Sequence, residues 1–91
     1  MNKGELVISV ASRSGMTRKH AEQAVTAVFD SITDALAAGD RVALAGFGSF
    51  EVRERAARIG RNPQTGEEIR IEAARVPTFR PGQPLKDRVA G

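Results

Sequence analysis

The chain of 91 residues contains no cysteine, no tyrosine and a single histidine, His20. Without cysteine it can form neither a disulfide bond nor a cysteine-based catalytic or metal site, and an intracellular protein is the simpler inference. One histidine and no tyrosine leave no set of side chains that would converge on a reacting atom. We therefore expect no enzymatic activity, no cofactor or metal, and no small-molecule substrate.

Long apolar segments are also missing. No run approaches the roughly 18 residues of a membrane span, and the N-terminus has the pattern of a capped helix rather than a signal peptide. No internal repeat, low-complexity segment or linker divides the chain. We expect a single domain over residues 1–91, located in the cytoplasm and not at a membrane.

Two amphipathic helices are predicted in the N-terminal part. Asn2, followed three residues later by Glu5, has the form of a capping box, and apolar residues at helical spacing continue until Gly15. Thr17 is the next expected N-cap, and an apolar stripe of about five turns ends at Gly39. This stripe is wide enough to contact both the first helix and a second copy of the chain.

Two helices joined by a glycine-containing turn also fit a helix-turn-helix motif. A recognition helix needs polar or basic side chains that face a DNA groove. Beyond His20, however, the polar face of the second helix carries Glu22, Asp30 and Asp34. We therefore rank this motif below the hairpin described next.

A long β-hairpin is predicted in the middle of the chain. Strand-compatible runs flank Asn62, Pro63 and Gly66, and asparagine and proline suit the first and second positions of a type I turn. Between about residues 53 and 75 the hairpin contains few large apolar residues, and a two-stranded ribbon is marginal without a packed face. We expect this part to project as an arm.

Shorter elements flank the hairpin. A strand is expected over 41–44, and Gly46 and Gly48 allow a tight turn around Phe47. A small domain needs the volume of its aromatic residues, so all four phenylalanines are expected in the core. A short helix is expected over 82–91, and its free N–H groups suit phosphate. The phenylalanines are Phe29, Phe47, Phe50 and Phe79.

Positive charge is concentrated in the hairpin half. Residues 1–40 carry a net charge of −1 and residues 41–91 a net charge of +4, and nine of the ten cations in the second half are arginines. The arginine fork suits phosphates and base edges. Nucleic acid is therefore the expected partner, and an acidic protein surface is the alternative.

A family resemblance rests on three parts of the hairpin: the segment Gly46-Phe47-Gly48-Ser49-Phe50, the pair Arg55 and Arg58, and the segment Gly60-Arg61-Asn62-Pro63-Gln64-Thr65-Gly66. Together they resemble the signature of the bacterial HU/IHF family of histone-like DNA-binding proteins, and the likeness extends over essentially the whole chain.

The resemblance implies an α+β fold and an intertwined homodimer, or a heterodimer with a close paralogue. Residues 1–40 would form the helical dimerisation part. Residues 41–81 would form a small antiparallel sheet with the projecting arm of about 53–75, and residues 82–91 the C-terminal helix.

The resemblance also implies an architectural function. The two arms would enter the minor groove of double-stranded DNA, and Pro63 at each tip would unstack a base step and bend the duplex, compacting the nucleoid. A role for Pro63 in shaping the turn alone stays open. The residues implied in DNA binding are Arg53, Arg55, Arg58, Arg61, Asn62, Pro63 and Arg70 in the arm, and Lys3, Gly46, Gly48, Arg80 and Lys86 outside it.

Departures from the family pattern bear on specificity. Gln83 stands where many HU relatives have lysine, whereas Ala45 stands where some IHF chains have an arginine that could reach a base edge. We favour HU-like binding with little sequence specificity. A sequence-specific IHF-like subunit stays an alternative, as does a dimeric module that binds an acidic protein.

Overall fold

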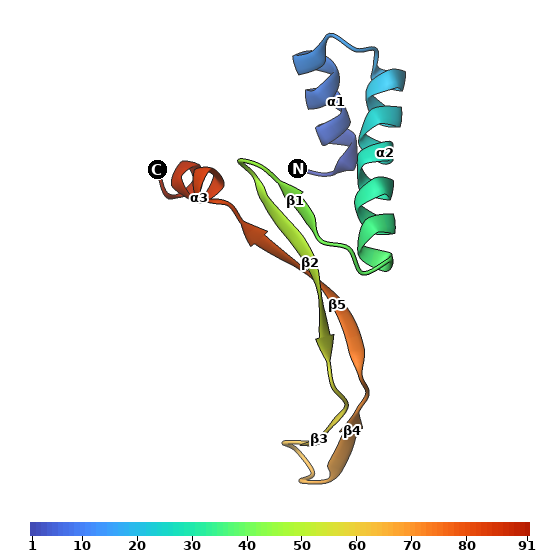
Figure 1. The fold of residues 1–91 in the computed structure, drawn as a ribbon, viewed down its shortest axis with the longest axis vertical. Helices are drawn as coiled ribbons and strands as arrows, with labels where there is room; N and C mark the ends of the chain where they lie inside the picture. The colour runs from blue at the N-terminus through green and yellow to red at the C-terminus, as the bar shows by residue number, and fades with distance from the viewer.

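A computed structural model describes the whole chain, Met1–Gly91. Three helices and five strands combine in the predicted α+β order, and Figure 1 shows them as a helical hairpin, a small sheet and a long arm. The elements are α1 (Lys3–Ser14), α2 (Arg18–Ala37), β1 (Val42–Leu44), β2 (Gly48–Arg55), β3 (Arg58–Arg61), β4 (Glu68–Ile71), β5 (Ala74–Pro81) and α3 (Gln83–Ala90).

The helix ends lie where the caps predict them. The Asn2 side chain accepts a hydrogen bond of 2.8 Å from the Glu5 backbone N–H at the start of α1. Gly15 then ends α1 with a φ of 72°, a left-handed conformation that glycine adopts at little cost. At the start of α2, the Thr17 hydroxyl accepts a hydrogen bond of 3.2 Å from the His20 N–H.

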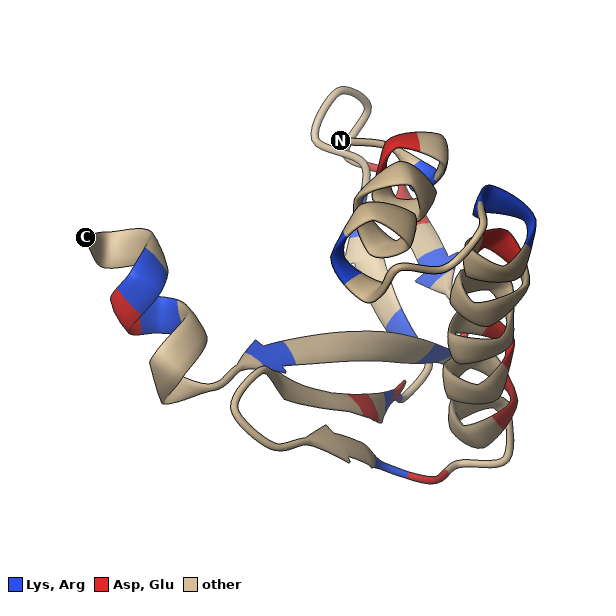
Figure 2. Ribbon diagram, turned by 90° about the horizontal axis from the view of Figure 1, so that it is seen from above, with Lys and Arg blue, Asp and Glu red and all other residues tan.

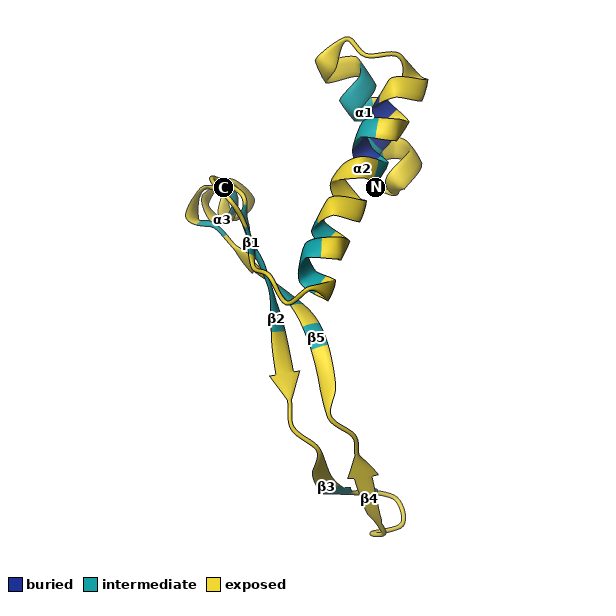
Figure 3. Ribbon diagram, turned by 45° about the vertical axis from the view of Figure 1, so that its right-hand side comes forward, coloured by how far each residue is buried: buried dark blue, intermediate teal, exposed yellow.

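The apolar core of the single chain is very small. Val7, Ala21 and Val25 are its buried members, all between α1 and α2, as the dark blue positions in Figure 3 show. The accessible area is 7347 Å², whereas a compact chain of 9.7 kDa exposes about 5100 Å². The radius of gyration is 18.7 Å, against about 12 Å for a compact domain of this length.

The expectation that every phenylalanine fills a core is wrong for the single chain. Phe29, Phe47 and Phe79 are exposed, and only Phe50 is half-buried. The Phe79 ring packs against Phe47 and Phe50 at centroid distances of 5.4 and 4.8 Å. Because α2 meets the strands through residues near its C-terminal end, such as Leu36, this aromatic cluster has little cover within the chain.

The strands form two antiparallel sheets. In the first, β2 lies between β1 and β5, with Phe50 opposite both Val42 and Phe79. The second contains only β3 and β4. Residues 56–57 and 72–73 lie between the two sheets and are not paired.

The predicted arm is therefore not one continuous hairpin. Two residues are unpaired in each of the two chain segments of the hairpin, so the pairing register of β3 with β4 continues that of β2 with β5. Three of the four unpaired residues are alanines, whose side chains contribute little to cross-strand contacts. We call residues 58–71, beyond the break, the distal ribbon.

The tip of the distal ribbon differs from the predicted four-residue turn. The Gly66 N–H donates to the Asn62 carbonyl at 2.7 Å, and the Asn62 N–H donates to the Glu67 carbonyl at 2.8 Å. The turn therefore closes one residue later than a type I turn would. Gly66 has a φ of 72°, which explains why glycine stands there.

Candidate nucleic-acid interface

The central sheet has two chemically different faces. Side chains alternate across a strand, so Phe50 and Val52 of β2 share a face with their partners on β5. Val52 and Pro77 line a hollow together with Leu36 of α2, which identifies this as the helix face. We call the opposite side the open face. Its cations on β2 and β5 are Arg53, Arg55 and Arg80.

A fourth arginine lies at the open face, although sequence reasoning did not select it. Arg41 Nη2 donates a hydrogen bond of 3.3 Å to the hydroxyl of Ser49, which is the one buried polar residue of the chain. Arg41, Ser49 and Arg80 line a common hollow of about 340 Å³. Nearby, Arg80 Nε lies 3.8 Å from Glu51 Oε1, so one carboxylate partly offsets the positive charge of this face.

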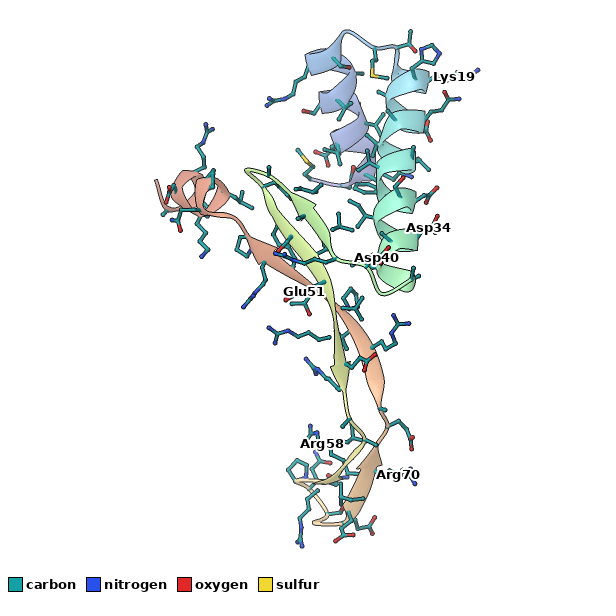
Figure 4. The ribbon with its side chains drawn as sticks, in the orientation of Figure 1. Lys19, Asp34, Asp40, Glu51, Arg58 and Arg70 are labelled. Atoms are coloured by element: carbon teal, nitrogen blue, oxygen red, sulfur yellow. The ribbon has the colours of Figure 1, made fainter.

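The distal ribbon divides its arginines between two faces. Arg61 and Arg70 lie on one face, together with Ile59. Arg58 lies on the other, so the structure does not bring all three predicted arginines to one surface. Figure 4 shows Arg58 and Arg70 near the end of the arm, far from the helices. Glu72 Oε1 lies 3.2 Å from Arg70 Nε in an exposed ion pair.

Asn62 and Pro63 lie in the loop that joins β3 to β4 at the end of the arm. Asn62 Oδ1 accepts a hydrogen bond of 2.9 Å from the Gln64 N–H, so this side chain stabilises the turn itself. Pro63 is exposed, and it has no N–H that the turn would need to satisfy. The structure thus presents a rigid apolar ring in the exposed loop between β3 and β4.

Gly46 and Gly48 shape the turn between β1 and β2. Gly46 has a φ of 80°, which favours glycine. A β-carbon on Gly48 would lie 2.6 Å from both the Arg80 carbonyl oxygen and the Phe79 ring, so packing excludes any side chain there. The Gly82 N–H donates to the Phe47 carbonyl at 2.8 Å, which ties this turn to the start of α3.

The two predicted lysines lie apart from the arm. Lys3 begins α1 and shares a hollow with Arg18 and Glu22, whereas Lys86 is exposed on α3. The molecule is 57 Å long, and the arm occupies one end of that length (Figure 1). The predicted residues therefore form an open-face group, a distal-ribbon group, the two glycines beside the β1–β2 turn and two outlying lysines.

Charges of both signs occur on the helices and on the strands. Figure 2 shows acidic positions recurring along α2 and basic positions on the strands and α3, with further basic positions on α1 and at the start of α2. The acidic residues of α2 are Glu22, Asp30 and Asp34. No group of acidic or histidine side chains is arranged to hold a metal ion. None of the helices combines the length and apolar character needed to cross a membrane.

A cationic open face that continues into a long exposed ribbon defines the class of protein. Such a surface suits an extended polyanion, and its arginine content favours nucleic acid. Comparison with known proteins then identifies the family. The family model described as bacterial DNA-binding protein matches residues 1–90.

Relatives match over nearly their whole length. The chain is 65% identical over 89 residues to DNA-binding protein HU of Geobacillus stearothermophilus, covering 98% of this chain and 99% of that protein. It is 62% identical over 91 residues to DNA-binding protein HU 1 of Bacillus subtilis, covering 100% of this chain and 99% of the relative.

Solved structures show the same fold. The Anabaena HU–DNA cocrystal structure superposes with a TM-score of 0.90 at 51% identity, covering 99% of this chain and 98% of that one. HU from Thermotoga maritima gives a TM-score of 0.71 at 35% identity, with 98% of both chains covered.

The chain belongs to the bacterial DNA-binding protein family of HU and IHF, and its curated relatives carry the name HU. The resemblance predicted from the hairpin is thereby confirmed. The family consists of DNA-binding proteins and not of enzymes.

Proposed function

We propose that this protein binds double-stranded DNA as a symmetric dimer and bends it with little sequence specificity, as an architectural protein of the nucleoid. The observation that carries the proposal is the cationic open face, which leads into a projecting ribbon with Pro63 at its end. The names of the relatives and the Anabaena HU–DNA cocrystal support DNA as the partner.

We infer the dimer because the single chain buries too few apolar side chains to form a sizeable core. An apolar groove between α1 and α2 is lined by six hydrophobic residues, and the chain exposes about 2200 Å² more than a compact chain of its mass. A second copy that covered the groove and the aromatic cluster would supply the burial that one chain lacks. The residues that line the groove are Leu6, Val10, Ala24, Val25, Val28 and Phe29.

The open face would hold the duplex through its phosphates. Arg41, Arg53, Arg55 and Arg80 present guanidinium groups there, and neutralised phosphates release counterions. Gly46 and Gly48 act indirectly in this proposal, because they let the turn and β5 pack closely beside these arginines.

The arms would follow the minor groove on either side of the body. Arg61 and Arg70 share one ribbon face and would contact the groove, while Arg58 on the other face would reach a backbone phosphate. Asn62 holds the turn so that Pro63 can enter a base step. Unstacking costs a few kcal/mol per step, and the extra contacts that bent DNA allows would offset it.

The positions of Lys3 and Lys86 predict that these lysines contact bent DNA better than straight DNA. Both lie on the body and away from the arm, so a straight duplex held by the arms would pass at a distance from them. DNA that bends around the body would bring its flanks towards these lysines. They would therefore stabilise the bent form more than the straight form.

Salt dependence of duplex binding tests the phosphate mechanism. The logarithm of the affinity should fall steeply as the logarithm of the salt concentration rises. Arg55→Ala and Arg61→Ala should each weaken binding to unrelated sequences alike and reduce the slope by about 1. Arg13→Ala, at the end of α1, is the matched control and should leave the slope unchanged. A flat slope for the unmodified protein contradicts the proposal, and a loss confined to one sequence favours an IHF-like reader.

A further inference from the structure

The distal ribbon has little to hold it in shape. β3 and β4 have four residues each, pair only with each other in the sheet, and are separated from the central sheet by unpaired residues. An isolated two-stranded ribbon is marginal in water. Within residues 58–71 only Gly60 and Asn62 are half-buried, and all the others are exposed. Whatever covers Gly60 is thus one of the few packing contacts of the ribbon.

Ile71 is the side chain that covers Gly60. A β-carbon on Gly60 would lie 3.1 Å from Ile71 Cδ1 and 3.8 Å from Ile71 Cγ1, so the isoleucine side chain reaches diagonally over the glycine, whose direct strand partner is Ile69. Ile71 is 37% exposed, whereas Ile59, on the other face of the same ribbon, is 64% exposed. In a strand, glycine often marks a close approach by another group, and here that group is Ile71.

We propose that Ile71, packed on Gly60, is a positioning residue for the tip that carries Pro63. Ile71 itself faces away from Arg61 and Arg70, and its effect passes through the ribbon. By holding β3 against β4 it keeps the Asn62 and Gly66 hydrogen bonds closed, and these set the direction in which Pro63 points. This role deepens the proposed function and rests on it.

The contact explains why glycine stands in the interior of β3, where it weakens a strand. A larger residue at position 60 would push the isoleucine away from the strand. The packing also lies on the ribbon face without carboxylates, since Glu68 lies on the face of Ile59. The arm is thereby stiffened on the face opposite Arg61 and Arg70.

The first test uses the full-length protein without DNA. Hydrogen exchange of the Asn62 and Gly66 amides reports opening of the tip, because both donate hydrogen bonds there. Ile71→Ala should speed their exchange about tenfold, as expected for losing the burial of a partly exposed isoleucine. Ile59→Ala removes the same atoms from the opposite face and should change exchange less than about twofold. Equal effects of the two variants would overturn the proposal.

The second test measures bending of an end-labelled duplex by energy transfer at saturating protein. Ile71→Ala should bind DNA but bring the duplex ends less close than the unmodified protein does. If Ile71→Ala speeds exchange yet bends DNA fully, the positioning role is wrong. If the unmodified protein binds without bending, the proposed function fails instead, and the exchange data alone then decide whether Ile71 holds the tip.

Discussion

Replacing Phe29 by alanine tests whether a second copy of the chain covers the apolar groove. Phe29 lines that groove and is 43% exposed. A phenylalanine side chain has about 200 Å² of area, so about 90 Å² would become buried in a dimer. At 25 cal/mol per Å² this contributes about 2 kcal/mol per subunit. A symmetric dimer carries the change twice, so Phe29→Ala should cost about 4 kcal/mol and raise the dimer Kd about a thousandfold.

Sedimentation equilibrium over a range of protein concentrations measures this Kd directly. Ile8→Ala is the matched control, because Ile8 is 49% exposed on α1 but does not line the groove. Its Kd should stay within about fivefold of the unmodified protein. Equal Kd values for the two variants would refute the assigned interface. A folded, unmodified protein that sediments as a monomer would refute the dimer itself.

Two further substitutions separate packing from charge at the open face. Gly48→Ala should lower the free energy of unfolding by about 1–3 kcal/mol, because its β-carbon would clash with Arg80 and Phe79. Gly4→Ala in α1 should not lower the free energy of unfolding in this way. Equal urea midpoints for the two variants would contradict this prediction. Glu51→Gln removes the anion beside Arg80 and should tighten DNA binding about threefold, the typical strength of an ion pair near the surface. If fluorescence anisotropy showed weaker DNA binding by Glu51→Gln, this would contradict the role of the open face as the DNA-binding surface.

The local parts of the fold could be predicted from sequence because each depends on near neighbours. Asn2 and Thr17 cap their helices through residues three positions away, and Gly15 ends α1. The exposure of Phe29 and Phe47 could not be predicted in this way. It depends on how the helices and strands of the whole chain are arranged, and this arrangement leaves the core expected of 91 residues missing.

The candidate site was predicted from the sequence as one set of residues, whereas the structure divides these residues between several surfaces. Simple alternation along β3 separates Arg58 from Arg61, a signal that the sequence already holds. Arg41 was missed because its role depends on a side-chain contact with Ser49 in the next strand. The break at residues 56–57 and 72–73 also leaves no clear sequence signal, since alanine is compatible with a strand as well as with a loop.

The most direct test of the central claim compares how strongly the Pro63→Ala variant and the unmodified protein bend DNA. Energy transfer between the labelled ends of a duplex is measured at saturating protein, with Gln64→Ala as the control at the neighbouring tip position. The unmodified protein and Gln64→Ala should bring the ends together, while Pro63→Ala should bind the duplex and bend it clearly less. Equal bending by all three proteins would leave Pro63 as a turn residue only. Binding without any bending would contradict the architectural function altogether.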